Sequence, residues 1–273
     1  MEAFLNHPAV QAGVAPFFAG LIVALILHRL KLGGLAVVAA FATAVWLIAG
    51  FTFSPLTATR KIILLALAAP IVGILIDFAF KPTRLGTFLI AAAAGVAVLW
   101  VFYPVLKQKE LQQALYLGGG AALFVMWLVG FSLSAFADRP VQCGAAALMM
   151  GLGAGVLAFL GASASYAQYG ISLGAGAGAF LIVLMLTGKA YAAGATLALS
   201  ATLASGLLVA GTMILAQLQW YAVAIFALTP LAARLPGLGF TPIWMQAFLQ
   251  SIYALVPVTA ACAMAYYGPR AFS

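Results

Sequence analysis

Apolar residues fill the chain in blocks of about 20, the length that a helix needs to cross the hydrocarbon core of a membrane. The blocks are apolar on every side, whereas the strands of a membrane β-barrel alternate apolar and polar residues. Every backbone polar group must find a partner inside the chain when hydrocarbon surrounds it, so these blocks predict helices. We expect ten of them, over residues 9–28, 33–53, 61–80, 85–105, 112–136, 140–162, 170–188, 191–216, 219–235 and 244–267.

The segments between the blocks are short and carry charged or turn-forming residues. HRLKL joins the first two blocks, KPTR joins the third and fourth, and DRP joins the fifth and sixth. Links of this length place consecutive helices antiparallel and side by side. The pattern therefore predicts an all-α fold, a polytopic transmembrane helix bundle that forms one integral membrane domain over residues 1–273.

Two parts of this pattern allow a different interpretation. The block 219–235 is short and contains Pro230, which removes a helical hydrogen bond. The sixth and seventh blocks are joined by SASYAQYG, a link without charge. Such a link suits either two full spans or a re-entrant pair of half-helices.

A weak internal similarity raises the question of a repeat. A shift of 160 positions aligns Leu-Ile-Val at 21–23 with the same triplet at 181–183. That shift relates helices of the same orientation, whereas an inverted repeat would divide the chain near Asp138. The inverted division gives the halves 1–137 and 138–273, between which the residues show no persuasive match.

Composition supports the membrane interpretation and limits the kinds of partner. Only 6% of the residues are charged, 66% are hydrophobic and the mean hydropathy is +1.19, which excludes a water-soluble domain of this size. The net charge of +8 comes from Lys and Arg residues between the blocks, where they anchor helices at lipid head groups. We expect the lipid bilayer, other membrane subunits or a second copy as partners, and no nucleic acid.

The first residues bear on location. MEAFLNHPAV lacks the basic stretch that precedes the apolar core of a cleaved signal peptide. We therefore expect the first helix to remain as an uncleaved insertion signal. The whole pattern is typical of a multi-pass protein of the bacterial inner membrane.

No set of residues predicts catalysis or a metal centre. Transfer or hydrolysis needs convergent carboxylates, or a His or Cys beside a base. The acidic residues are instead scattered over different blocks and links: Glu2, Asp77, Glu110 and Asp138. Cys143 and Cys262 are far apart and show no metal-ligand spacing. We expect no enzyme activity, no metal and no cofactor.

Asp77 is the only acidic residue inside an apolar block. A charge within a membrane span is costly, so Asp77 is a candidate for coupling solute movement to a proton or cation. Asp77 also precedes Lys81 by four residues, on the same helix face and in the favourable order for an ion pair. The sequence therefore supports both a coupling carboxylate and an interfacial ion pair.

Glycine recurs at every fourth position in the sixth and seventh blocks. These steps are formed by Gly151 and Gly155, and by Gly170, Gly174 and Gly178. A helix face lined by glycine lets a second helix approach to backbone contact. We expect these residues to pack helices together.

Uncharged polar residues gather in two places. The link after the sixth block contains Ser163, Ser165, Tyr166, Gln168 and Tyr169. Such a cluster forms either an interfacial turn with Tyr anchors or a substrate niche, for which Tyr166 and Gln168 are the candidates. In the last block Gln246, Gln250 and Tyr253 are spaced by four and three. They share one face, which suits an inter-helix contact or the lining of a cavity, so Gln246 and Gln250 are further candidates.

Two functions fit these features. A permease for a small or lipid-like solute agrees with the many helices and with the prolines inside them, and the scarcity of polar residues favours an apolar solute over an ion. A non-catalytic subunit, scaffold or assembly factor of a larger membrane complex explains the same features without chemistry. The second function predicts Gly and Ala grooves on the lipid-facing surface that no helix of this chain fills.

Overall fold

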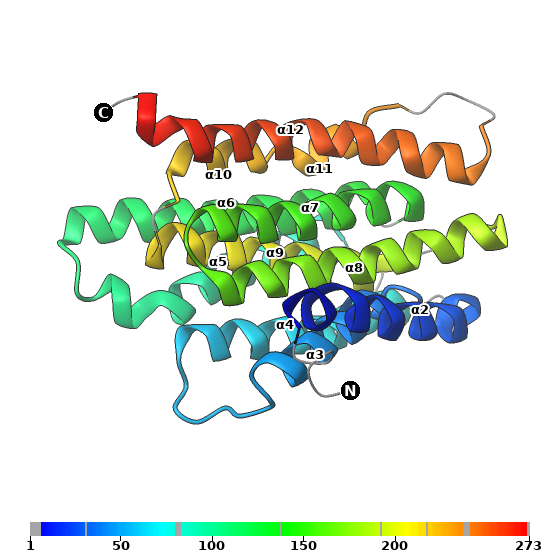
Figure 1. Ribbon diagram of the computed structural model, residues 1–273, viewed down its shortest axis with the longest axis horizontal. Helices are drawn as coiled ribbons and strands as arrows, with labels where there is room; N and C mark the ends of the chain where they lie inside the picture. The colour runs from blue at the N-terminus through cyan, green and yellow to red at the C-terminus, as the bar shows by residue number, and fades with distance from the viewer. Residues whose placement is uncertain are drawn as a thin grey trace.

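The computed structural model of the protein describes residues 7–30, 32–79, 83–136, 138–191, 193–216, 218–236 and 241–271, without the side chains of 268–271. All regular elements in these residues are helical (Figure 1). They are a π-helical turn η1 (Val10–Val14), α2 (Ala15–Leu27), a 3-10 turn η2 (His28–Leu30), α3 (Leu35–Ile48), α4 (Ala58–Phe78), α5 (Arg84–Leu106), α6 (Leu111–Phe136), α7 (Pro140–Leu160), α8 (Ala164–Thr187), α9 (Gly194–Leu215), α10 (Trp220–Phe226), α11 (Thr229–Ala233) and α12 (Ile243–Ala271).

Eight helical stretches of the described chain are long and apolar enough to cross a membrane. They are Val10–Leu30, α4, α5, α6, α7, α8, α9 and the first part of α12, Ile243–Tyr267. This set is compatible with a multi-pass membrane protein. The other two predicted blocks, 33–53 and 219–235, form the shorter apolar helices Leu35–Ile48 and Trp220–Ala233. Ten spans, the internal repeat and the division near residue 138 stay predictions.

Both shorter helices end for reasons that are visible in the sequence. After α3, Gly50 adopts a positive φ of 65°, a conformation that ends a helix, and Pro55 follows in the same segment. Between α10 and α11 the chain turns at Ala227 and Leu228. Pro230 stands in the first turn of α11, where its missing N–H costs nothing. The break in the ninth block thus agrees with the position of its proline.

Helix α9 forms the centre of the bundle. In its most apolar stretch 94% of the residues are buried, against 28% to 67% in the other seven spans. It packs against α4, α6 and α7, while α12 lies with α10 and α11 along one side and α2, α3 and α8 form the other side (Figure 1).

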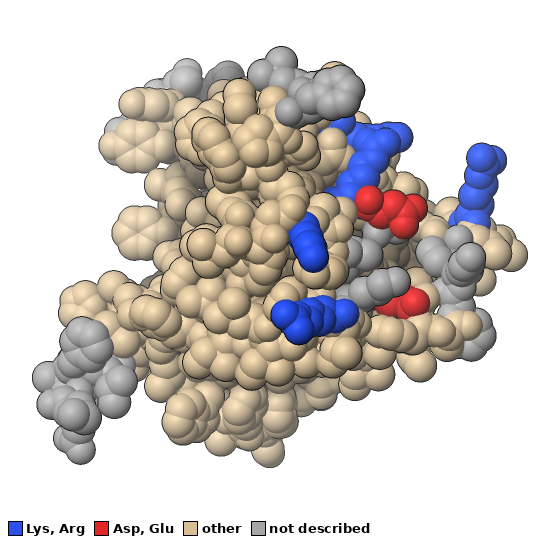
Figure 2. Space-filling view, turned by 90° about the vertical axis from the view of Figure 1, so that its right-hand side faces the viewer, with Lys and Arg blue, Asp and Glu red and all other residues tan. Residues whose placement is uncertain are grey.

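Contacts between helices define two ends of the bundle. At the Asp77 end, Asp77 of α4 and Gly34 before α3 both reach the first turn of α9. At the Tyr166 end, Tyr166 of α8 contacts Thr59 at the start of α4 and Gly211 near the end of α9. Figure 2 looks onto the Asp77 end, where Lys and Arg side chains lie near acidic ones among uncharged residues.

The link predicted between the sixth and seventh blocks is mostly helical. The chain reverses within three residues, Gly161 to Ser163, and Ala162 takes a positive φ of 63° in this turn. Helix α8 begins at Ala164, so Tyr166 and Gln168 lie in its first two turns and not in a loop. The expected start at residue 170 was wrong because a tight turn needs only these three residues. Both α7 and α8 have the length of full spans.

Candidate functional site

Asp77 binds the beginning of helix α9. Its Oδ1 accepts a hydrogen bond from the backbone N–H of Ala195 at 2.6 Å. Its Oδ2 accepts from the Thr196 N–H at 2.9 Å and from the Thr196 hydroxyl at 2.6 Å. The first N–H groups of a helix lack partners within that helix, and a carboxylate there also faces the positive end of the helix dipole. Asp77 thus acts as an N-terminal cap supplied by a different helix.

Glycines allow this cap to form. A Cβ atom on Gly73 would lie 2.5 Å from Thr196 Cα, so only glycine lets α4 come this close to α9. Gly194 has a φ of +64°, and a Cβ there would collide with the Asp77 carboxylate. Gly73 and Asp77 are four residues apart and share one helix face. That spacing is the one sequence signal that links the two residues.

Both predicted roles of Asp77, ion pairing and coupling, stay predictions. Lys81 lies outside the described residues, so the Asp77–Lys81 ion pair stays a prediction. The coupling role also stays a prediction, although both carboxylate oxygens already accept hydrogen bonds from α9. An Asp that holds two helices together has a structural reason to be present inside an apolar block.

Tyr166 is buried at the centre of the Tyr166 end. Its hydroxyl accepts a hydrogen bond from the Thr59 hydroxyl at 3.3 Å, and its ring lies against Gly211. Tyr169 is buried against Phe41, with the ring centroids 5.6 Å apart. Gln168, between the two tyrosines, is only partly buried. Both tyrosines are therefore core residues of α8 and do not anchor a surface turn.

Gln246 and Gln250 of α12 donate hydrogen bonds to backbone carbonyls that precede this helix. The Gln246 side-chain amide donates to the Thr241 carbonyl at 2.7 Å, and that of Gln250 donates to the Leu235 carbonyl at 3.1 Å. Gln250 is buried, and its side-chain carbonyl oxygen has no partner within the described structure. Both glutamines lie at the Asp77 end, so the bundle separates them from Tyr166 and Gln168. The predicted polar residues thus do not form one site.

Four of the predicted glycines meet in pairs between α7 and α8. Gly151 faces Gly174, and a Cβ on Gly151 would lie 2.7 Å from Gly174 Cα. Gly155 faces Gly170, where the same construction gives 2.6 Å between a Cβ on Gly170 and Gly155 Cα. We call these four residues the glycine seam. At the seam the two helix backbones touch, which leaves no room for a side chain or a ligand.

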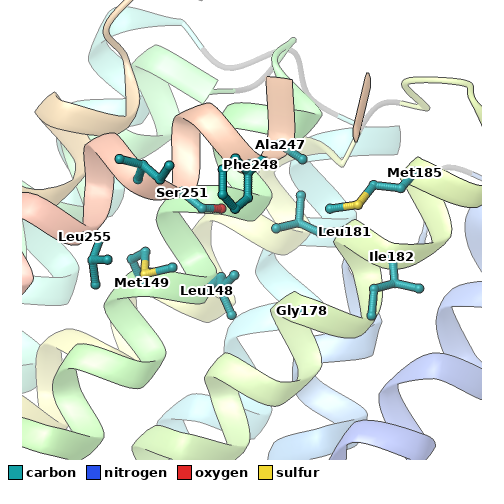
Figure 3. A pocket seen from close by; sticks show the side chains of 11 residues that line it. Leu148, Met149, Gly178, Leu181, Ile182, Met185, Ala247, Phe248, Ser251 and Leu255 are labelled. Atoms are coloured by element: carbon teal, nitrogen blue, oxygen red, sulfur yellow. The ribbon is translucent and has the colours of Figure 1, made fainter. Parts of the chain in front are cut away.

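Gly178 continues the same spacing but faces a cavity. A Cβ there would meet only the Leu148 side chain, at 3.5 Å. The cavity of about 370 Å³ lies between α7, α8 and α12, and its labelled side chains turn toward a common space (Figure 3). The lining is apolar apart from Ser251. It suits hydrocarbon rather than a charged solute.

A larger opening of about 710 Å³, which we call the lateral groove, lies between α6 and α10. Its floor includes Met213 of α9, and its sides are formed mainly by Tyr116, Gly120 and Trp127 of α6 and by Trp220 and Ala224 of α10. The Trp127 indole N–H donates to the Ala227 carbonyl at 3.0 Å, which binds α6 to the break between α10 and α11. Sequence reasoning missed this groove because the spacing of residues along α6 does not indicate that α10 lies opposite Trp127.

Lys61 satisfies a carbonyl that a proline leaves without a donor. Pro104 has no N–H, so the Trp100 carbonyl four residues earlier lacks its helical hydrogen bond. The Lys61 ammonium donates to that carbonyl at 3.0 Å and lies 4.6 Å from the centroid of the Trp100 ring. Neighbouring Arg60 donates to the Pro55 carbonyl at 2.7 Å and to the Thr52 hydroxyl at 3.1 Å. Both basic residues at the start of α4 thus have specific hydrogen-bond partners.

The described residues bring together packing and capping contacts and two apolar cavities. They contain no group of three or more His, Cys, Asp or Glu side chains that could hold a metal ion. Of the two cavities, the lateral groove is the larger and has aromatic residues along its length. No protein-family model matches this sequence, and no curated protein is similar to it.

Proposed function

We propose that this protein is a permease that takes up a lipid-like solute sideways from the membrane, without enzyme activity. The lateral groove supports the proposal best. Its volume of about 710 Å³ falls within the range typical of small-molecule sites, and its walls are almost entirely apolar. It also lies beside the broken pair α10 and α11, and discontinuous helices are common at transporter binding sites.

The distribution of polar groups favours a lipid-like solute over an ion. Asp77 accepts hydrogen bonds from the first turn of α9, and the side-chain amides of Gln246 and Gln250 donate to backbone carbonyls that precede α12. The centre of the bundle is filled by α9. A solute that needs few hydrogen bonds and approaches from the flank of the molecule fits these contacts, because hydrocarbon places no polar demand on the site.

We infer further that all ten helical segments traverse the bundle. The start of α3 and the end of α4 both contact the first turn of α9, whereas the start of α4 contacts Tyr166 at the opposite end. The chain must therefore travel from the Asp77 end to the Tyr166 end along α3. The same reasoning applies to α10 and α11, which connect the end of α9 to the start of α12. We propose the bacterial inner membrane as the location, on the sequence pattern alone.

One observation favours the second function, a scaffold or subunit of a membrane complex. Among the residues that the structure describes, Gly13 and Gly119 have nothing within 4 Å of the position that a Cβ would occupy. Open glycine positions on a helix surface are suited to contact with a helix of another protein. A partner subunit or a second copy would fill such positions.

Transport and scaffolding are separated by an assay in vesicles. The purified protein is reconstituted with a fluorescent lipid in both leaflets, and dithionite is added outside to destroy accessible label. A permease gives a second phase of label loss that vesicles without protein lack. Absence of that phase, together with stoichiometric subunits retained in native mass spectrometry after gentle extraction, would support the scaffold and contradict the permease.

A further inference from the structure

We propose that the lateral groove binds one hydrocarbon chain of an anionic membrane lipid, with the lipid head group at Lys107 and Lys109. The inference deepens the proposed function and rests on it for the direction of use, but lipid binding can be tested without transport. Four features carry it: the length of the groove, its aromatic residues, the state of its polar groups and the charge beside its mouth.

The length of the groove matches one leaflet. From Tyr116 to Trp127 the lining runs about 16 Å along α6, at about 1.5 Å per residue. Half of the hydrocarbon core of a bilayer is about 15 Å thick. A chain that enters at Tyr116 therefore reaches Trp127 near the depth at which an acyl chain ends.

Aromatic side chains mark both ends of this path. Tyr116 and Trp220 stand at the mouth, and 73% and 71% of their surfaces are exposed. Tyr and Trp with an apolar ring and one polar atom are typical of the membrane interface. Trp127 lies at the inner end, where its surface is 43% exposed and its ring faces the groove. The more exposed aromatic residues thus stand at the mouth and the less exposed one at the inner end, which is the order expected for a lipid.

Of the described residues that line the groove, Tyr116, Trp127 and Trp220 carry side-chain hydrogen-bond donors, and Tyr116 and Trp220 stand at its mouth. The Trp127 N–H is already bound to the Ala227 carbonyl at 3.0 Å. Gly120 of α6 and Ala224 of α10 both line the groove, and no described residue lies within 4 Å of the position of a Cβ on Gly120. A ligand segment with hydroxyl or amide groups would leave them unsatisfied there, whereas a hydrocarbon chain would not.

The mouth carries the charge that an anionic head group needs. Lys107 and Lys109 form the turn before α6, and Tyr116 lies less than two turns into that helix. Lys107 is exposed and Lys109 is partly exposed, with Glu110 as the acidic residue of the same turn. Lys residues at this level attract anionic lipid head groups.

Tryptophan fluorescence tests the proposal, because Trp127 itself lines the site. In one variant Trp127 is the only tryptophan, and in a reference variant only Trp46 remains, a residue of α3 that is 65% exposed. Each is reconstituted in phosphatidylcholine with increasing fractions of phosphatidylglycerol that carries brominated chains, which quench indole fluorescence on contact. We expect half-maximal quenching of Trp127 at about a fivefold lower fraction than that of Trp46, because the lysines enrich the anionic lipid.

Two neighbouring glycines supply a matched pair of variants. Gly119 and Gly120 both have open space around a Cβ, so leucine at either position is compatible with folding, but only Gly120 lines the groove. Gly120→Leu should remove the preferential quenching of Trp127, and Gly119→Leu should keep it. Replacing Lys107 and Lys109 by Gln should remove the preference for phosphatidylglycerol while brominated phosphatidylcholine still quenches Trp127.

The outcomes separate this inference from the proposed function. Equal quenching curves for Trp127 and Trp46, or equal curves in the two leucine variants, would overturn the lipid site even if the protein transports. If a lipid chain occupies the groove but the protein causes no lipid movement, the lipid site stands and the proposed permease is wrong. Weak quenching of Trp127 together with cross-links between Gly120→Cys chains would assign the groove to a second copy and would also overturn the inference.

Discussion

The glycine seam and the lateral groove use the same residue type for opposite purposes. At the seam, Gly151 meets Gly174 and Gly155 meets Gly170, so two backbones touch and the space is closed. In the groove, Gly120 of α6 faces α10 across an opening of about 710 Å³. Glycine in a membrane helix therefore does not itself indicate packing. What matters is whether a second backbone comes near enough to fill the position that glycine leaves empty.

The largest effect should come from adding one methyl group to the seam. In Gly170→Ala the new Cβ would collide with the Gly155 backbone, which cannot move without separating α7 from α8. We expect a loss of about 3 kcal/mol in the free energy of unfolding, at the upper end of the usual cost of overpacking. Denaturation in mixed micelles, followed by circular dichroism, measures it. Gly119→Ala is the control and should be neutral or slightly stabilising, since alanine favours helix more than glycine does. Equal losses in both variants would show that backbone contact at the seam is not what makes Gly170 necessary.

The second largest effect should come from the contact between Asp77 and the first turn of α9. Helix α9 packs against both α6 of the groove and α7 of the seam. Asp77→Ala removes three hydrogen bonds to the first turn of α9 and should cost about 2 kcal/mol. Asp77→Asn should cost roughly half as much, because one amide oxygen can still accept. Thr57→Ala, which removes a single cap bond of 3.4 Å in α4, is the comparison. If Asp77→Ala unfolds at the same denaturant concentration as the parent protein, the cap contributes nothing and another role for Asp77 gains weight.

A smaller effect is expected where Lys61 replaces a missing helical hydrogen bond. Lys61→Met should lower stability by about 1 kcal/mol, because the Trp100 carbonyl loses its donor. Pro104→Ala restores a backbone N–H for that carbonyl. In the double variant the loss from Lys61→Met should shrink toward zero, and a double-mutant cycle measures this coupling. Strictly additive losses would show that Lys61 does not serve the carbonyl.

The smallest effect on folding should come from filling the groove. Gly120→Leu should change the unfolding free energy by less than about 0.5 kcal/mol, because the side chain enters open space and leucine suits a helix. In the vesicle assay, however, it should slow the protein-dependent phase of lipid movement, while Gly119→Leu should not. If Gly120→Leu shows the same protein-dependent phase of lipid movement as the parent protein, the groove is not used for transport.

The sequence predicts the long helices because about 20 apolar residues are the length that a helix needs to cross hydrocarbon. Eight stretches have that length, whereas the blocks 33–53 and 219–235 form shorter helices. The turn at 161–163 is harder to predict, because Ala162 adopts a left-handed conformation that its residue type does not signal. Gly178 has the spacing of the seam glycines, yet it faces a cavity, since spacing gives the face of a helix but not its neighbour.

The contacts of the candidate site residues are predicted less well, because the sequence of one helix does not say which residues lie opposite it. Asp77 stands out in the sequence, but its partners, Ala195 and Thr196, are more than a hundred residues away and are ordinary residues in an apolar block. Tyr166 resembles an interfacial anchor until its burial beside Gly211 is known. The lateral groove arises from the distance between α6 and α10, which neither helix encodes alone.

Electron cryomicroscopy of the protein in lipid nanodiscs that contain phosphatidylglycerol would show whether the seam is closed and the groove holds a lipid chain. We expect a glycine seam with α7 and α8 in backbone contact, and an elongated density in the groove that runs from Tyr116 to Trp127. A map in which α10 packs against α6 and closes the groove, or in which a helix of another chain fills it, would show that the groove is not a lipid site.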